Sequence, residues 1–187
     1  MRRSRGDRLL PMIRQLLRYG FLIGLVALAN AQDVSRPDVP EKIKAPANEN
    51  VILRALASGS QIYTCAAGSD GKYAWTLKAP EAELRDAQGK LIGRHFGGPT
   101  WKHADGSEVT GKAVARVDAP DADSIPWLLV AAASHAGDGT FSHVTSIQRL
   151  RTHGGQPPLA AECNPGKQGV ETKSSYTAEY VFYAPGK

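Results

Sequence analysis

Histidine is the residue type in this chain with the widest chemical range, because imidazole binds metal ions and transfers protons near neutral pH. None of the five histidines forms a His-x-His or His-x3-His pair or a close cluster with cysteine. His135 and His143 flank the turn sequence 137–139, which would bring them near each other in a hairpin. Because the ligand spacing of protein zinc sites is missing, we predict a polar hairpin end and no metal site.

Carboxylates and hydroxyls also form no recognisable catalytic pattern. Glu81 and Glu83 would share one face of a strand, as a glycosidase pair might, but two such groups at a strand edge are usually solvated. Asp118, Asp121 and Asp123 lack the rest of a calcium-binding loop. The chain has no Gly-x-Ser-x-Gly elbow and no dinucleotide-binding glycine motif between a strand and a helix. We therefore predict no catalytic residue and no cofactor.

Aromatic and cationic side chains near predicted turns form the strongest candidate site. His95, Trp101 and Arg149 are suited to line a concave pocket with Trp75 beneath them, since ligand pockets combine apolar walls with a few polar groups. The alternative is that the tryptophans belong to the core and that Arg149 pairs with a carboxylate. From residue type we assign these four residues as candidate ligand contacts.

The chain contains two cysteines, Cys65 and Cys163, which could form a disulfide. An even count in an oxidising compartment favours a disulfide between them, and two separate free thiols are the alternative. The bond would close a loop of nearly a hundred residues.

The compartment is indicated by residues 1–31, which are typical of a removable secretory signal peptide. Six arginines precede the apolar run 21–29, and small residues lead up to Ala31. We predict cleavage between Ala31 and Gln32 and a periplasmic or secreted protein. An uncleaved anchor is the alternative, but the apolar run of nine residues falls short of the ~20 that a membrane span requires. After residue 31 the sequence predicts no membrane span.

Loss of this leader changes the charge of the chain. The full sequence has a formal net charge of +5, and removing six arginines and one aspartate leaves 17 basic and 17 acidic residues. Binding to nucleic acid requires cations that neutralise phosphates. A neutral mature chain therefore predicts no nucleic-acid partner.

The elements that must position the candidate residues are β-strands. Residues 32–50 contain three prolines and few large apolar side chains, which predicts an extended, loosely held N-terminal arm. From Val51 to residue 187 we predict one β domain, with glycine turns at 86–89 and 104–107. In the strand 108–117, the residues 109, 111, 113, 115 and 117 would share one face, and the closing strand would put Tyr176, Ala178, Tyr180 and Phe182 on one face.

One segment, 124–135, is open to two interpretations. Its alanines and its Ser124 cap suit a short helix, but its β-rich flanks and short length favour a strand. Numerous short strands with frequent turns predict an all-β, single-domain antiparallel sandwich or barrel with long loops and at most one short helix. The pattern does not distinguish a sandwich from a barrel.

An ordered set of segments resembles the exported domain-of-unknown-function family 3455 of bacteria and fungi. The resemblance covers about residues 39–183 and implies a secreted single domain to which no activity is assigned. The segments that carry it, in addition to Trp75, are 61–65 (QIYTC), 78–84 (KAPEAEL), 95–101 (HFGGPTW), 125–129 (IPWLL), 147–150 (IQRL) and 176–183 (YTAEYVFY).

Two classes of function are compatible with these features. The leading hypothesis is a non-enzymatic exported module that binds a small molecule, an envelope component or another protein. The alternative is an extracytoplasmic hydrolase whose catalytic residues converge only in the folded chain.

Overall fold

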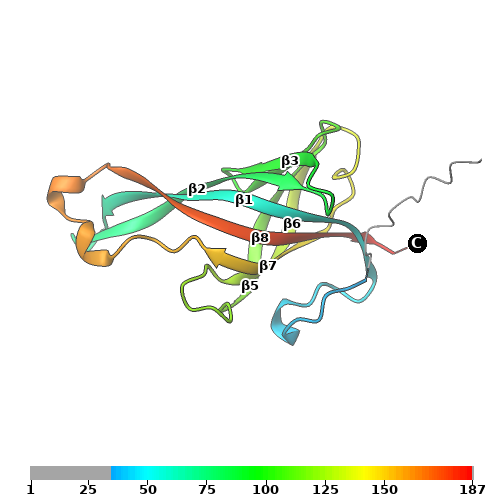
Figure 1. Ribbon diagram of the computed structural model, residues 1–187, viewed down its shortest axis with the longest axis horizontal. Coiled ribbons are helices and arrows are strands. Elements are labelled where there is room, and N and C mark those ends of the chain that lie inside the picture. Colours follow the sequence, from blue (N-terminus) through cyan, green and yellow to red (C-terminus); the bar gives the residue numbers. More distant parts are fainter. Residues whose placement is uncertain (1–34, 187) are drawn as a thin grey trace, which may run out of the picture. The chain divides into compact units, whose positions relative to one another are not determined.

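Eight antiparallel strands form one closed ring in the computed structural model of the chain, which describes residues 35–186 (Figure 1). Each strand pairs with the next along the sequence, and β8 pairs with β1 to close the barrel. The all-β prediction is confirmed, and the fold is a barrel. The strands are β1 (Glu49–Ala67), β2 (Tyr73–Arg85), β3 (Leu91–Phe96), β4 (Thr100–His103), β5 (Glu108–Val117), β6 (Trp127–Ala136), β7 (Ser146–Gly154) and β8 (Glu171–Pro185).

Helical structure in residues 35–186 is limited to three single 3-10 turns, η1 (Glu41–Ile43), η2 (Ala160–Glu162) and η3 (Pro165–Lys167). The ambiguous segment 124–135 therefore follows the favoured interpretation, since most of it belongs to strand β6. Ser124 forms an isolated bridge with Gly155 and caps no helix. No helix in the described part of the chain is long and apolar enough to cross a bilayer.

The interior of the barrel is filled by side chains that alternate along the strands. On β8, the four residues expected on one face are all buried, and they belong to a single core cluster. Trp101 packs edge-on against Phe182, and Phe141 stacks on Phe182 at 4.5 Å between ring centroids. Gly111 makes room for this packing, because a Cβ there would lie 2.4 Å from a Val130 methyl group and 3.3 Å from the Trp101 ring.

Strand β5 departs from the predicted alternation at Val114. The register with β6 shifts between Ala113 and Ala115, which leaves Val114 as an extra residue, a β-bulge. Val109 packs in the interior cluster, whereas Ala115 and Val117 pack against a second cluster that includes the N-terminal arm. The prediction that residues 109, 111, 113, 115 and 117 share one face is therefore wrong. The extra residue at the bulge reverses which side chains of β5 point to which face of the sheet.

The N-terminal arm is closely packed, in contrast to the expectation of a loosely held segment. Ile43 is fully buried in the second cluster, and its carbonyl accepts a hydrogen bond from Gln148 Nε2 at 2.6 Å. Arg36 donates to the carbonyls of Ala45 and Glu49. Val39 and Ala45 are also buried in this cluster, so apolar contacts and the hydrogen bonds of Arg36 together hold the arm. The predicted signal peptide and its cleavage site at Ala31 and Gln32 lie outside the described residues.

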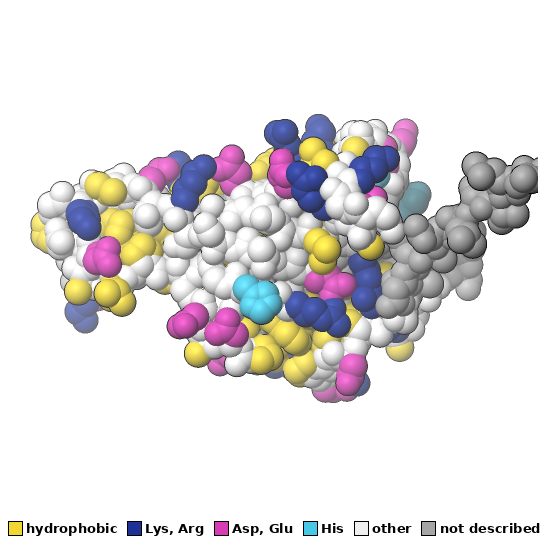
Figure 2. Space-filling model, viewed as in Figure 1, with side chains coloured by type: hydrophobic (Ala, Val, Ile, Leu, Met, Phe, Trp, Pro, Cys, Tyr) yellow, Lys and Arg dark blue, Asp and Glu magenta, His cyan; other side chains and the backbone are white. Residues whose placement is uncertain are grey.

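The outer surface of the closing ladder is polar. Ser58 lies opposite Thr177 and Ser60 opposite Ser175. Figure 2 shows that the middle of this face carries few charged or hydrophobic side chains. Ion pairs lie at its margins, such as Lys173–Glu81 at 2.6 Å and Arg54–Glu179 at 3.2 Å. Two large hydrophobic side chains of β1 are exceptions, since Ile52 is 36% exposed and Leu56 is 55% exposed.

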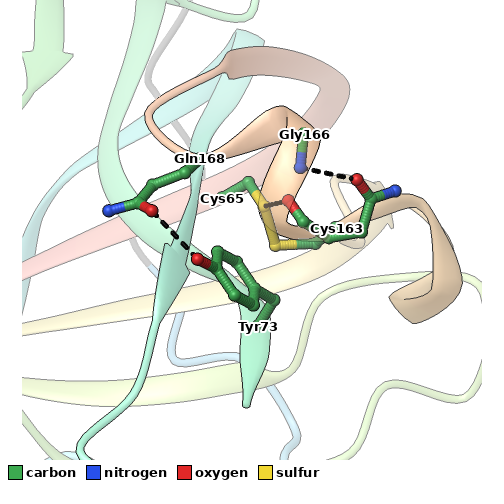
Figure 3. The surroundings of a disulfide bond; sticks show 6 residues. Cys65, Tyr73, Cys163, Gly166 and Gln168 are labelled. Atoms are coloured by element: carbon green, nitrogen blue, oxygen red, sulfur yellow. Dashed lines mark hydrogen bonds between the residues drawn. A yellow bond between two sulfur atoms is a disulfide. The ribbon is translucent and has the colours of Figure 1, made fainter. Parts of the chain in front are cut away.

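The predicted disulfide between Cys65 and Cys163 is present, and it joins β1 to the long loop that precedes β8 (Figure 3). Backbone hydrogen bonds reinforce the junction, from Gly169 N to Cys65 O at 2.9 Å and from Cys65 N to Val170 O at 3.0 Å. Next to the bond, the Tyr73 hydroxyl donates to Gln168 Oε1 at 2.9 Å. Such a bond is typical of proteins in oxidising compartments.

The two predicted glycine turns, 86–89 and 104–107, are confirmed. They differ in the hydrogen bonds that their aspartate side chains accept. Asp86 accepts two backbone N–H groups within its own turn, from Gln88 and Lys90. Asp105 accepts the N–H and hydroxyl of Ser107 and also the N–H and hydroxyl of Thr140, both at 2.8 Å. Its carboxylate therefore ties the β4–β5 turn to the loop before β7. These hydrogen bonds, that of the Ser107 hydroxyl first, hold the pKa of Asp105 well below its usual range.

We expect Asp105→Ala to lower the free energy of unfolding by about 2 kcal/mol, because two turns lose hydrogen bonds to a charged group that is partly exposed. Asp86→Ala is the matched control, and its loss should be about 1 kcal/mol because it joins no second loop. Urea unfolding of the two variants checks this. Equal losses would show that the bonds to Thr140 add nothing.

Candidate functional site

A pocket of about 620 Å³ opens at the end of the barrel where the wall is incomplete. The hairpin of β3 and β4 is short, so β2 pairs with β3 only from Ala82 onward and β5 pairs with β4 only up to Thr110. In the described chain, residues 73–80 of β2 and 112–117 of β5 each have a strand partner on one side only. Residues of both edges line the pocket, Leu77 on β2 and 113–116 on β5, together with Gln61 of β1 and Arg149 of β7.

Arg149 is the central residue of this pocket. It lies on β7 opposite Leu128 and Tyr180, so its side chain enters the barrel from the wall. Its Nε and Nη2 donate to the carbonyl of Pro126 at 3.2 and 2.9 Å. Among residues 35–186 no carboxylate lies within ion-pair distance of this guanidinium, which contradicts the alternative that Arg149 pairs with a carboxylate.

The charge of Arg149 affects the side chains around it. Burial raises the pKa of Tyr63 and of Tyr180, and the Arg149 guanidinium opposes this rise in both cases. Burial also lowers the pKa of His95 to about 3, and Arg149 adds to that effect. A cation at this position favours the negatively charged form of whatever lies next to it.

Two further polar groups on β1 face the pocket. Gln61 is 2% exposed, and its Nε2 has no hydrogen-bond partner among the described residues. Tyr63 donates its hydroxyl proton to the carbonyl of Gly155 at 2.7 Å, which positions the ring at the wall. A buried amide N–H without an acceptor is costly, because its hydration is lost without replacement. A ligand acceptor would satisfy it.

The mouth of the pocket is cationic and partly apolar. Lys42 from η1 and Arg116 from β5 join Arg149 in the lining, which among the described residues contains no carboxylate and no histidine. Arg116 also lies 3.9 Å from a carboxylate outside the lining, that of Asp118. Leu77 and Val114, which are 50% and 58% exposed, stand on opposite sides of the opening. The volume falls in the range of ~300–1,000 Å³ that small-molecule sites occupy. The arrangement is suited to an anionic group with an apolar body.

The four residues predicted as ligand contacts are only partly brought together. His95 and Trp101 stack inside the barrel at 4.2 Å between ring centroids and are almost fully buried. Tyr180, opposite Arg149, packs edge-on against both rings, so these two residues lie directly behind the pocket and do not line it. Trp75 lies on β2 opposite Cys65 and does not line the pocket. Direct contact of these residues with a ligand stays a prediction.

Gln61, Tyr63, Arg116 and Lys42 were not anticipated as site residues. The alternation of segment 61–65 places Gln61, Tyr63 and Cys65 on one face, and a glutamine on an otherwise buried face is a signal that could have identified it. Arg116 faces the pocket because of the bulge at Val114, which the sequence pattern did not indicate.

The other groups considered for chemistry are held by local contacts. Glu81 pairs with Lys173 and Glu83 with Arg85, each at 2.6 Å. His135 Nε2 donates to the carbonyl of Val144 at 2.7 Å. Within residues 35–186, no three histidine, cysteine or acidic side chains are grouped so that they could hold a metal ion.

Comparison with known proteins gives one match. A family model described as a protein of unknown function (DUF3455) matches residues 46–184. No curated protein and no solved structure matches the chain.

Proposed function

The chain belongs to the DUF3455 family, whose description assigns no activity, and we propose that it is an exported, non-enzymatic protein that binds a small anionic ligand in the barrel pocket. The observation that carries this proposal is the Arg149 guanidinium, which faces the pocket without a carboxylate partner among the described residues.

The remaining groups of the pocket support an anion. Gln61 Nε2 supplies a buried donor that lacks an acceptor, and Lys42 and Arg116 add positive charge near the mouth. Charge-assisted hydrogen bonds from a guanidinium to a carboxylate are roughly twice as strong as neutral ones. An anion would therefore satisfy Arg149 and Gln61 together, which a neutral ligand cannot do as well.

Binding accounts for this pocket better than hydrolysis does. General acid–base hydrolysis needs a carboxylate or histidine in reach of the substrate, and the described lining provides neither. Its polar groups are donors that hold a negative charge. The proposal of export depends on the leader sequence 1–31 and agrees with a disulfide between Cys65 and Cys163.

We expect Arg149→Gln to weaken binding of hexanoate at least tenfold, because the loss of a hydrogen bond to a charged group is worth about 1.5–3 kcal/mol. Isothermal titration of mature protein with hexanoate measures this, with hexanamide as the neutral probe. Arg94→Gln is the matched control, since Arg94 is an exposed arginine that lies outside the pocket. Equal affinity of native protein and Arg149→Gln for hexanoate, or no binding by the native protein, would contradict the proposal.

A further inference from the structure

The pocket follows the free edge of a strand as well as the barrel interior. Four consecutive residues of β5, from Ala113 to Arg116, line it. Neighbouring side chains from both faces of a strand can border one pocket where the pocket passes the edge of that strand, and the bulge at Val114 adds a further residue there. In the described chain this edge has no strand partner beyond Thr110. The pocket therefore borders backbone N–H and C=O groups that face outward from the sheet.

The opposite wall is a second free edge. Residues 73–80 of β2 pair with β1 alone among the described strands, and Leu77 from this stretch lines the pocket across from Val114. A small anion next to Arg149 and Gln61 would occupy only the inner end of this space. The outer part is bordered by two strand edges, with Leu77 on one and Val114 on the other. A polypeptide in extended conformation is suited to this space.

We infer that the anion is the free C-terminal carboxylate of an extended peptide, which adds to the edge of β5 as a further strand. This inference rests on the proposed function. Strand addition gives affinity through main-chain hydrogen bonds, and capture of a terminal carboxylate adds direction and charge. Arg149 and Gln61 hold the carboxylate, while Leu77 and Val114 contact the peptide's side chains.

The charge of the edge argues for a peptide and against a second copy of this chain. Pairing of two copies through β5 would be symmetric and would place Lys42 and Arg116 of each copy near the same cations of the other. Like charges placed together in an interface are unfavourable. A carboxylate-terminated partner has the complementary charge.

The test uses an N-acetylated hexapeptide of alternating threonine and valine, with either a free C-terminal carboxylate or a C-terminal amide. We expect mature protein to bind the free acid at least tenfold more tightly than the amide, as measured by isothermal titration. Arg149→Gln should remove that difference. In hydrogen exchange, the backbone amides of residues 112–117 should be slowed by the free-acid peptide and not by hexanoate.

A proline on the edge separates strand addition from anion binding. Val114 is the bulged residue of the β5–β6 ladder, a position that tolerates proline, and Val114→Pro removes an N–H and places a ring where a further strand would add to β5. We expect this variant to bind the free-acid peptide at least tenfold more weakly and hexanoate as tightly as before. Val114→Thr, which keeps the N–H but loses an apolar group, measures the side-chain contact alone, and Val114→Pro should bind the free-acid peptide much more weakly than this variant does.

The outcomes distinguish this inference from the proposed function. Binding of hexanoate that depends on Arg149 would support the anion site. The peptide inference is wrong if, in that case, the two peptides bind equally. It is also wrong if Val114→Pro binds the free-acid peptide as native protein does. If neither hexanoate nor the free-acid peptide binds, both fail. If light scattering shows a dimer whose 112–117 amides are protected without peptide, the occupant of the edge is a second copy and the inference is wrong.

Discussion

Reduction of the disulfide between Cys65 and Cys163 is expected to lower the free energy of unfolding by about 4–5 kcal/mol. The two cysteines are separated by 98 residues in the sequence, so the bond removes much of the freedom of the unfolded chain. Chain-entropy models give ~4.7 kcal/mol for a loop of about 100 residues. Most single substitutions cost far less than this.

Thermal unfolding of mature protein with and without dithiothreitol measures the effect as a fall in the midpoint temperature. The double variant Cys65→Ser with Cys163→Ser should match the reduced native protein and should not respond to dithiothreitol. An unchanged midpoint on reduction would contradict the prediction. Far-UV circular dichroism at low temperature shows whether the reduced barrel is still folded, which we expect because the backbone bonds around Cys65 remain.

The second large effect is a loss of stability in acid that is caused by His95. Burial is the main reason that its pKa falls to about 3, and its Nδ1 donates to the carbonyl of Thr100 at 2.9 Å. In the unfolded chain the pKa of histidine is about 6.5. As the pH falls from about 6.5 toward 3, the unfolded chain takes up a proton that the folded protein cannot accept. Stability is therefore lost as the pH falls through this window, by up to about 1.4 kcal/mol per pH unit.

Urea unfolding at pH 7, 6, 5 and 4.5 tests this prediction. Between pH 6 and 4.5, native protein should lose about 2 kcal/mol more than the variant His95→Gln, whose side chain keeps a donor for Thr100 and does not titrate. Carboxylates such as Asp105 lose their contribution at lower pH, since the stability contributed by a carboxyl whose folded pKa is depressed is lost only as the pH falls below its unfolded value of about 3.9. Parallel pH profiles of the two proteins would contradict a buried neutral His95.

The strands and turns were predictable because their signals are local. Alternation places the apolar residues of β8 on one face, and the glycines at 89 and 106 take the positive φ that their turns require. The disulfide was predictable from the count of cysteines and the expected compartment. These features depend on residues that are close in sequence or few in number.

The closure of the ring and the shape of the pocket depend on contacts between distant residues. The pairing of β1 with β8 distinguishes a barrel from a sandwich, and no short pattern specifies it. Across the bulge at Val114, β5 changes from packing in the interior cluster at Val109 to packing against the N-terminal arm at Ala115, which simple alternation does not predict. Of the four candidate ligand contacts, Arg149 lines the pocket and Trp75, opposite Cys65, does not, and residue type alone does not distinguish the two.

The connection made by the disulfide also bears on the order in which the barrel assembles. Seven of the eight ladders join neighbouring strands, but the ladder of β1 with β8 joins the two ends of the ring. Such a pairing is slow to form, because a long loop must close before any contact stabilises it. Cys163 lies shortly before β8 begins at Glu171, and Cys65 lies near the end of β1. When the disulfide forms before this ladder does, it holds the end of β1 close to the segment that leads into β8, and the pairing no longer requires the closure of a long loop.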